Sequence, residues 1–291
     1  MQFEDVVDSF SEIDVDLNHY QHLYPNLFNE NRSRYYDIDS FNSVDYKSGT
    51  DLSVLHINAR SLNANFDNIN ALFHTLSIKF DVICISESWL DESTYNLYKF
   101  DGYVAFHSVR ATRGGGSCIY VKNTFNCERV DISINMEFVN DVFVKITNES
   151  KTIIVGSVYR SQRADASNFI QSLLGILTRI NGVKSHDLFV CGDFNFDILG
   201  IGSCDDSLNF LNVLNTCSLI PMITKPTRVT DSTASLLDNI FVRDPINFIS
   251  GIIENTITDH YPVFYIKKDL FPNNNKNSSI TVRFRIVNEN T

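Results

Sequence analysis

The sequence predicts an α/β protein with helices packed on mixed β-sheets, and two observations support this prediction. A strand, a helix and a second strand open the region that follows residue 51. Four strand-like segments then follow over residues 103–159 without a helix between them. The first pattern is typical of layered α/β folds, whereas strands that follow one another directly pair antiparallel.

The individual elements follow from the spacing of apolar side chains. Residues 52–58 are strand-like, apolar residues recur at helical spacing across 66–79, and the short apolar run 80–85 predicts a buried strand. Later strands are expected at 103–107, 117–122, 139–146, 152–159, 187–191, 236–242 and 261–266. Later helices are expected at 166–180 and 207–217.

One large domain with two appendages is expected, because 291 residues is near the upper size for a single core. Residues 1–50 hold ten acidic against three basic side chains and show no sustained periodicity. They are interpreted as a weakly structured acidic extension, although residues 35–38 could dock on the domain. The folded domain is expected over residues 51–270, followed by an Asn-rich linker and truncated tail over 271–291.

The composition indicates a globular enzyme rather than a disordered or membrane-spanning chain. Hydrophobic residues make up 43% and charged residues 20% of the chain, and no apolar run approaches the roughly 20 residues that cross a bilayer. No secretory signal is expected, and the six cysteines form no C-x-x-C pair, which favours a reducing compartment. The net charge of −11 argues against tight metal-free binding to DNA, but bound cations would offset the carboxylates of a metal-dependent nuclease.

Polar side chains interrupt the apolar pattern at the ends of five expected strands. They are Asn58, Glu87, Asp193 with Asn195, Asp238, and Asp259 with His260. Rigid strand ends hold short side chains in place. Hydrolysis of a phosphate ester needs oxygen ligands for a hard cation, a group that transfers a proton, and a group that stabilises the transition state. Each residue alone has a simpler explanation, such as an Asx-turn at Asp193, but the joint pattern predicts a hydrolytic site.

These residues belong to motifs with a definite order along the chain. The motifs are Asn58, Ser86-Glu87-Ser88-Trp89, Tyr159-Arg160, Gly192-Asp193-Phe194-Asn195, Ser235-Leu236-Leu237-Asp238 and Thr258-Asp259-His260. In this order they resemble the endonuclease/exonuclease/phosphatase superfamily over residues 52–267. Several stretches are similar to the endonuclease domain of non-LTR (LINE-type) retrotransposons. They are residues 35–41, His56-Ile57-Asn58-Ala59-Arg60-Ser61-Leu62, residues 86–90, residues 113–120, Ile223-Thr224-Lys225-Pro226-Thr227-Arg228 and residues 235–241.

The resemblance implies a four-layer sandwich, with two mixed β-sheets packed face to face and helices on the outer faces. It also implies a Mg²⁺-dependent site that could use Mn²⁺ instead. Glu87 would bind the metal ion, with Asn58 and Asp259 as further ligands or supports. Asp193 would either activate the attacking water or protonate the leaving oxygen, and both assignments stay open.

The remaining roles concern the phosphate. Asn195 would position the phosphate or the water, and Tyr159 would donate a hydrogen bond to a phosphate oxygen. Asp238 would pair with His260, whose imidazolium would stabilise the transition state. Asn58 would also orient the catalytic aspartate.

Substrate contacts are expected from Arg113, Arg160, Asn195 and Arg228. The stretch Arg113-Gly114-Gly115-Gly116 is not a P-loop, because no Lys-Ser/Thr pair follows it, and a hairpin turn is the better interpretation. Trp89 is expected to pack beside Glu87.

The resemblance implies an endonuclease that nicks one DNA strand and leaves a 3′-hydroxyl, in retrotransposon-type target nicking or in the manner of an apurinic endonuclease. DNA is the expected partner, without a membrane or an obligate protein partner, and the reverse transcriptase of a complete element is expected to be absent from this chain. A DNA target favours the nucleus over the cytoplasm. Two alternatives stay open: a phosphatase or phospholipase of the same superfamily, and a non-catalytic binding remnant of a retrotransposon.

Overall fold

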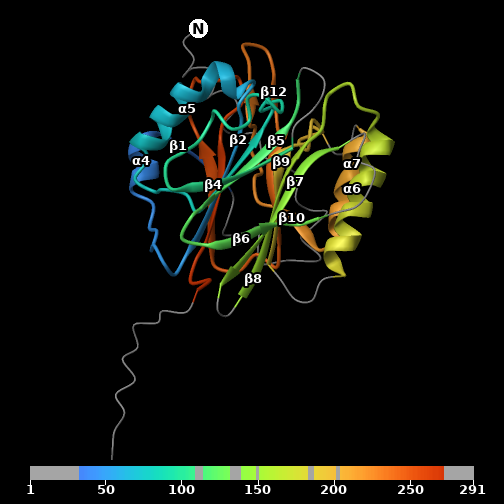
Figure 1. Ribbon diagram of the computed structural model, residues 1–291. Coiled ribbons are helices and arrows are strands. Elements are labelled where there is room, and N and C mark those ends of the chain that lie inside the picture. Colours follow the sequence, from blue (N-terminus) through green and yellow to red (C-terminus); the bar gives the residue numbers. More distant parts are fainter. Residues whose placement is uncertain are drawn as a thin grey trace, which may run out of the picture.

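The computed structural model describes residues 33–108, 114–131, 139–148, 151–182, 187–200 and 204–271. Two β-sheets pack face to face, and helices lie on both outer sides (Figure 1). The predicted four-layer sandwich is therefore confirmed. Its four layers are helices, the first sheet, the second sheet and helices.

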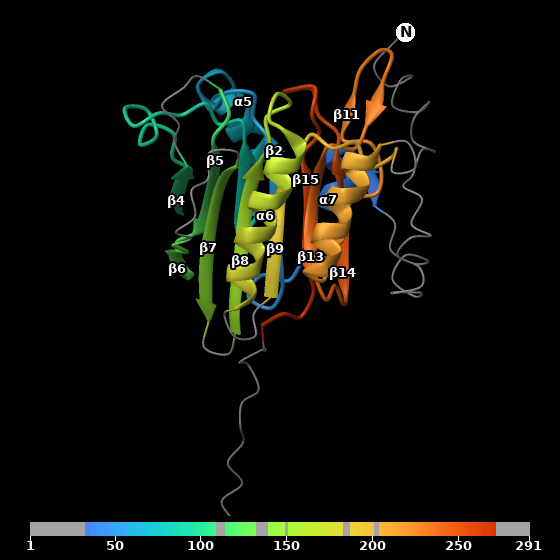
Figure 2. The same cartoon turned by 90° about the vertical axis from the view of Figure 1, so that its right-hand side faces the viewer.

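Both sheets contain parallel and antiparallel neighbours. The first has the order β1 (Arg34–Tyr36), β14 (Phe248–Ile253), β15 (Val263–Lys267), β2 (Leu52–Asn58), β3 (Val82–Ser86), β5 (Ser117–Lys122) and β4 (Tyr103–Ser108). The second has the order β10 (Leu219–Pro221), β13 (Asp238–Arg243), β9 (Asp187–Asp193), β8 (Lys151–Tyr159), β7 (Asn140–Asn148) and β6 (Asn126–Arg129). The pairs β1–β14, β2–β3 and β8–β9 are parallel. A small hairpin, β11 (Arg228–Val229) with β12 (Ala234–Ser235), projects beyond the sheets in Figure 2.

The helices divide between the two outer faces. α4 (Ile38–Asn42) and α5 (Leu62–Thr75) lie outside the first sheet, whereas α6 (Ala166–Asn181) and α7 (Asp205–Thr216) cover the second. α5 begins earlier than predicted, because the Ser61 side chain accepts a hydrogen bond from the Ala64 backbone and caps the helix.

The alternation of side chains along β2 brings a polar residue between the sheets. Val54 packs in the core that both sheets share, whereas Leu55 and Ile57 pack in the layer under α4 and α5. Successive side chains of a strand point to opposite faces, so Asn58 at the strand end faces the second sheet, as Val54 does. All seven residues of β2 are buried, and Asn58 is therefore held inside the sandwich.

The N-terminal segment differs from its expected lack of structure. Residues 34–36 form β1, which adds a parallel strand to the edge of the first sheet, and Phe41 of α4 is completely buried. The Tyr35 hydroxyl donates to the Pro226 carbonyl at 2.8 Å. Residues 33–50 are therefore part of the packed domain. A strand of three residues is too short to show a periodicity, which is why the sequence pattern did not indicate it. Residues 1–32 and the expected tail after Phe271 lie outside the described residues.

Three other strands of the two large sheets were not predicted, and neither was the hairpin of β11 and β12. β14 has the sequence Phe-Ile-Ser-Gly-Ile-Ile, in which Ser250 and Gly251 interrupt the apolar run. β6 is short and polar, and β10 has three residues and ends in Pro221. Each of these strands takes its place from its partner strand rather than from its own pattern.

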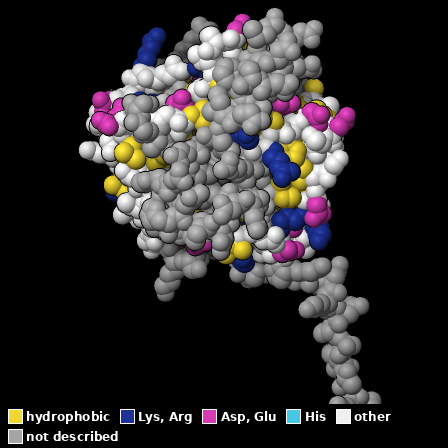
Figure 3. All heavy atoms as spheres, turned by 180° about the vertical axis from the view of Figure 1, so that it is seen from behind, with side chains coloured by type: hydrophobic (Ala, Val, Ile, Leu, Met, Phe, Trp, Pro, Cys, Tyr) yellow, Lys and Arg dark blue, Asp and Glu magenta, His cyan; other side chains and the backbone are white. Residues whose placement is uncertain are grey.

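The described surface carries charges of both signs. On the face shown in Figure 3, acidic and basic side chains lie in separate small groups, and neither sign forms a continuous patch among the coloured residues. None of the described helices is both long and apolar enough to span a membrane.

The burial of Phe41 leads to a stability prediction. Its ring contacts Phe80 and Phe264, at centroid distances of 5.8 and 5.0 Å. We expect Phe41→Ala to lower the free energy of unfolding by about 3–5 kcal/mol, measured by urea denaturation. Ile246→Ala removes a side chain that is 70% exposed and serves as the control, with a change within about 0.5 kcal/mol. Equal stability of the two variants would show that α4 does not pack as described.

Candidate active site

The polar strand ends gather at one end of the sandwich. In the second sheet, β8, β9 and β13 place Tyr159, Asp193 and Asp238 side by side, because Tyr159 is paired in register with Asp193 and Asp193 with Asp238. In the first sheet, Asn58 at the end of β2 is in register with Ser86 at the end of β3. Glu87 follows directly, so the two sheets contribute facing groups to one site.

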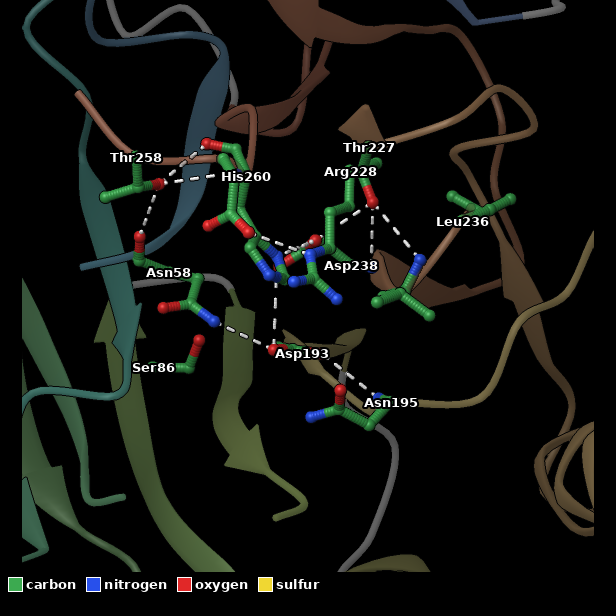
Figure 4. Close-up of polar contacts among 12 residues, drawn as sticks. Asn58, Ser86, Asp193, Asn195, Thr227, Arg228, Leu236, Asp238, Thr258 and His260 are labelled. Carbon is green, nitrogen blue, oxygen red and sulfur yellow. Dashed lines mark hydrogen bonds and ion pairs between the residues drawn. The ribbon is translucent and has the colours of Figure 1, made fainter. Parts of the chain in front are cut away.

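The Asn58 side chain joins the carboxylates of both sheets. Its Nδ2 donates to Glu87 Oε1 at 2.9 Å and to Asp193 Oδ2 at 2.8 Å. Its Oδ1 accepts a hydrogen bond from the Arg60 backbone at 3.0 Å, which fixes the orientation of the amide. Figure 4 shows the amide pointing at Asp193 across the space between the sheets. One completely buried amide therefore sets the spacing of two acidic groups.

A second set of contacts holds the histidine. His260 Nδ1 lies 2.8 Å from Asp238 Oδ2 and 4.0 Å from Asp193 Oδ2 (Figure 4). Asp238 Oδ2 also accepts a hydrogen bond from the Thr227 hydroxyl at 2.9 Å. That hydroxyl in turn accepts from the backbone N–H of Leu237 and of Asp238. The pair expected between Asp238 and His260 is thus present, and Thr227 orients it.

Burial and charge determine the protonation of these groups. Burial lowers the pKa of His260, but the nearby charges of Asp238 and Asp193 raise it, to about 9. Burial alone would raise the pKa of Asp238, but His260 and Thr227 hold it below its usual value. Burial, reinforced by the charge of Asp238, raises the pKa of Asp193 to about 8. The directions of these shifts favour an imidazolium at His260 and a proton on the Asp193 carboxyl, whose burial disfavours the charged form.

Burial acts in the same direction on His56, the second histidine next to Asp238, but there it outweighs the charge of Asp238. It lowers the pKa of His56 to about 4, so this imidazole is neutral. The two histidines therefore differ in charge although Asp238 lies next to both, with His56 Nδ1 at 3.7 Å from Asp238 Oδ1.

The positions of the donor atoms show which side chains of the site could bind a divalent cation. Ligand atoms of Asp193, Asp238 and His260 lie within 4.8 Å of one another, close enough to surround an ion. However, a protonated imidazole cannot be a ligand. Glu87 fits the requirement better, because it lines an open pocket of about 490 Å³ beside Tyr159 and His260. Mg²⁺ is commonly bound by one or two carboxylates and by the phosphate of the substrate, and this pocket offers that combination.

Asp259 lies at the same pocket, but its carboxylate is already paired. Its Oδ1 accepts from Arg60 Nη1 at 2.6 Å, and its Oδ2 accepts from Arg228 Nε at 2.9 Å. In this structure Asp259 therefore holds two arginines at the rim of the pocket. Arg228 reaches the pocket, as expected for a substrate contact. Arg113 lies outside the described residues.

Arg160 and Asn195 lie on the other side of Asp193. The Arg160 guanidinium turns inward, donates to the backbone carbonyls of Asn195 and Ala164, and stacks 4.1 Å from the Phe196 ring. Only 8% of Arg160 is exposed. The Asn195 backbone donates to Asp193 Oδ1 at 3.0 Å, while its amide donates to the Arg160 carbonyl. Arg160 therefore supports the loop that carries Asn195, and it does not line the pocket.

The local backbone is unusual around the site. Arg60, Ser61, Glu87, Trp89 and Asn195 all have positive φ angles, between 41° and 89°. Non-glycine residues adopt this conformation when surrounding contacts impose it, and such residues cluster at functional sites. The prediction from sequence missed Arg60, Trp89 and Thr227, although each lies within two residues of one that was predicted.

The glycine before Asp193 is required by close packing. A Cβ at Gly192 would lie 1.9 Å from the Val158 carbonyl oxygen of the neighbouring strand. Only glycine therefore lets β9 pair closely enough with β8 to bring Asp193 beside Tyr159.

The raised pKa of His260 predicts a measurable titration. We expect its imidazole to titrate near pH 9 in a ¹⁵N NMR experiment, and in Asp238→Asn to titrate at a lower pH. Because the folded-state pKa lies above the usual 6.5, the stabilisation is full below pH 6.5 and is lost as the pH rises through 9. Its size is on the order of 3 kcal/mol. His56 is the internal control and should remain neutral at pH 6; a His260 titration at or below pH 6.5 would contradict the assignment.

Comparisons with known proteins identify the family and the fold. Residues 54–260 match the model of the Endonuclease/Exonuclease/phosphatase family. No curated protein matches the chain. The fold is similar to the endonuclease domain of TRAS1, a telomere-specific non-LTR retrotransposon, with 15% identity, a TM-score of 0.59, and coverage of 76% of this chain and 100% of that one. It is also similar to an AP endonuclease from Leishmania major, with 16% identity, a TM-score of 0.61, and coverage of 77% and 90%.

A third similar structure is a phosphatase. It is a mannosyl-6-phosphatase from Bacteroides thetaiotaomicron, with 16% identity, a TM-score of 0.57, and coverage of 74% of this chain and 98% of that one. At these identities the solved structures show the shared fold, and the family match adds the chemistry of phosphodiester and phosphate ester hydrolysis. The chain belongs to the endonuclease/exonuclease/phosphatase family.

Proposed function

We propose that the chain is a divalent-metal-dependent endonuclease that nicks one strand of DNA. The observation that carries this proposal is the network of Asn58. Through one amide, a carboxylate suited to a cation, Glu87, is held beside a carboxyl group suited to proton transfer, Asp193. The imidazolium of His260 completes the set 4.0 Å from Asp193.

In the proposed mechanism, Glu87 would hold a Mg²⁺ or Mn²⁺ ion, which when bound would supply Lewis-acid stabilisation of the phosphate. The Asn58 amide keeps Glu87 and Asp193 in position. Asp259, which pairs with two arginines, would assist the cation from a greater distance. The chain's own residues bind and orient the phosphate and move the proton.

His260 and Tyr159 would bind the non-bridging oxygens of the phosphate. Both line the pocket next to Glu87. Burial and the charges of Glu87 and Asp193 raise the pKa of Tyr159, so its hydroxyl keeps its proton and can donate a hydrogen bond. An imidazolium at the same phosphate would stabilise the additional negative charge of the transition state.

Asp193 would protonate the leaving oxygen. Its raised pKa keeps a proton on the carboxyl at neutral pH, which favours this role over activation of water as the first step. Attack of water on phosphorus would break the P–O3′ bond, and the Asp193 proton would pass to O3′ to give a 3′-hydroxyl and a 5′-phosphate. The proton lost by the water would pass to solvent or return to the Asp193 carboxylate. Asn195, whose backbone contacts Asp193, would position the phosphate or the attacking water.

Two observations support DNA as the substrate. Arg60, Arg163 and Arg228 line the pocket, and a phosphodiester backbone is the substrate that a row of guanidinium groups would bind. Two similar structures are endonucleases of a retrotransposon and of the AP class. A DNA substrate would place the activity in the nucleus. The complete polar network argues against a non-catalytic remnant.

A nicking assay tests the proposal. We expect the full chain with Mg²⁺ to convert supercoiled plasmid to open circles, and EDTA to abolish the conversion. Asp193→Asn and His260→Asn should each lower the rate by at least about 100-fold, because each removes a group that acts on the transition state. Nicking is measured by agarose gel electrophoresis.

Matched controls use exposed residues of the same types. Asp231→Asn and His74→Asn remove an exposed carboxylate and an exposed imidazole, and should leave the rate unchanged. If the plasmid stays intact at saturating Mg²⁺ and phosphate is released from a sugar phosphate, the chain is a phosphatase and the endonuclease proposal is wrong. Absence of both activities would favour the binding remnant.

A separate prediction concerns the cation. Because Asn58 orients Glu87, we expect Asn58→Ala to raise the Mn²⁺ dissociation constant about 10- to 100-fold, as loss of an outer-shell partner does in other metal sites. Binding of Mn²⁺ is measured by electron paramagnetic resonance without substrate, so the result does not depend on activity. Asn123→Ala, at the far end of β5, is the control. An unchanged dissociation constant would exclude Glu87 with Asn58 as the metal site.

A further inference from the structure

The rim of the pocket contains an aromatic group that the proposed reaction does not use. Trp89 lines the pocket together with Arg60, Arg163 and Arg228. It is the only tryptophan in the sequence, and 40% of its surface is exposed. The expected packing beside Glu87 therefore leaves much of the indole in contact with solvent. Indoles in folded proteins are on average largely buried, so an exposed one at a charged pocket indicates a binding role.

Backbone contacts fix the direction of Trp89. Glu87 and Trp89 line the pocket, whereas Ser88 and Leu90, on either side of Trp89, are buried. The N–H of Trp89 donates to the Gly115 carbonyl at 2.9 Å. Glu87 and Trp89 have φ angles of 50° and 53°, which the surrounding contacts impose. The backbone that carries the indole is therefore held in place.

The segment is also attached to the first turn of α5. The backbone N–H groups of Ser61 and Leu62 donate to the carbonyls of Glu87 and Ser88, at 2.9 and 3.0 Å. The segment that carries Trp89 is thus hydrogen-bonded to Gly115 on one side and to the start of α5 on the other, which fixes its position relative to the catalytic groups. A flat ligand against the indole would lie next to the pocket that contains Glu87.

The neighbouring pocket wall has no side chains. Gly114 and Gly115 line the pocket with φ angles of 94° and 76°, which favour glycine. Among the described residues, no atom lies within 4 Å of a Cβ added to Gly114. None of the described side chains therefore fills the pocket beside Trp89 at this glycine.

The two arginines held by Asp259 add a charged contact. Arg60 is 51% and Arg228 31% exposed at the side chain. Each uses one guanidinium nitrogen in its bond to Asp259, and a guanidinium has five N–H donors. The remaining donors match the geometry of phosphate oxygens. The rim thus combines a surface for an aromatic ring with donors for an anion.

We propose that this rim binds the nucleotide next to the scissile phosphate, with its base stacked on Trp89 and its other phosphate paired with Arg60 and Arg228. The inference rests on the proposed function and adds a substrate class: a polynucleotide with an unstacked base, in a single strand or a locally opened duplex. Every base has a π face on which an aromatic side chain can stack. The rim therefore binds polynucleotides without selecting their sequence.

The single tryptophan provides a direct test of stacking. We expect a single-stranded dodecadeoxynucleotide to quench the indole fluorescence of Asp193→Asn in Mg²⁺, where cleavage is prevented. A dodecamer of abasic residues carries the same phosphates without bases, and we expect it to quench much less. Equal quenching by the two oligonucleotides would overturn the stacking assignment.

Affinity separates the two kinds of contact. In the same background, Trp89→Leu should weaken binding of the base-containing dodecamer roughly 5- to 150-fold, as loss of one stacked base does, and Trp89→Phe should retain most of the affinity. Binding of the abasic dodecamer should be unchanged in both, as measured by the anisotropy of a terminal label. Equal affinities of Trp89→Leu and the parent for the base-containing dodecamer would also overturn the proposal.

The arginines should respond differently. Arg60→Gln and Arg228→Gln should weaken binding of both oligonucleotides and reduce the slope of log affinity against log salt by about 0.7 each. Arg243→Gln, at the opposite end of β13 from Asp238, is the charge-matched control and should change neither. An unchanged slope in both rim variants would exclude the phosphate contact.

Failure of the chemistry gives a different result. Hydrolysis of bis(p-nitrophenyl) phosphate by the unmodified chain with Mg²⁺ tests the phosphodiesterase without using the rim. Base-dependent quenching without hydrolysis would support the nucleotide site and sink the proposed enzyme. Hydrolysis without base-dependent quenching would sink the nucleotide site and keep the enzyme.

Discussion

The amide of Asn58 connects the two sheets at the point where each carries an acidic side chain. Both of its N–H donors are used, one on Glu87 and one on Asp193. Because the backbone of Arg60 holds the amide oxygen, the amide cannot rotate without losing a buried hydrogen bond. An aspartate at this position would put a third carboxylate between two others. The separation of the cation site from the proton-transfer group is therefore a property of the packing of one sheet against the other.

The same packing of the two sheets explains the shifted pKa values of the buried groups. Asp193, Asp238 and His260 are buried between the sheets, where unpaired charges are costly. One charge pair forms, between Asp238 and His260, and burial raises the pKa of the third group, Asp193. The free-energy cost of burying these ionisable groups is borne at the site because proton transfer requires them there. A neutral aspartic acid loses little hydration free energy when it is buried, whereas a charged one loses much. Burial therefore favours the acid form of Asp193 at a pH at which exposed aspartates are ionised.

Sequence reasoning could predict the central site because its members are short side chains at strand ends. Once the strands pair, Asn58, Asp193 and Asp238 have almost no freedom to lie elsewhere. Long side chains were harder to place: Arg160 turns inward because Phe196 offers a ring to stack on, and Asp259 meets an arginine 199 residues away in the sequence. The exposure of Trp89 depends on a left-handed backbone that no pattern of apolar residues reveals.

The short strand β1 affects how this domain can be separated from its surroundings. Residues 54–260 carry the family match, but β1 covers the edge of the hydrophobic strand β14. Its Tyr35 also holds the Pro226 carbonyl, one residue before Thr227, which orients Asp238 and His260. A gene segment cut at the family boundaries would lose both β1 and β15, the two neighbours of β14 in the first sheet, and would leave strand edges that can pair with other chains. The segment of chain that must stay together for an intact fold is therefore longer than the segment that contains the catalytic residues.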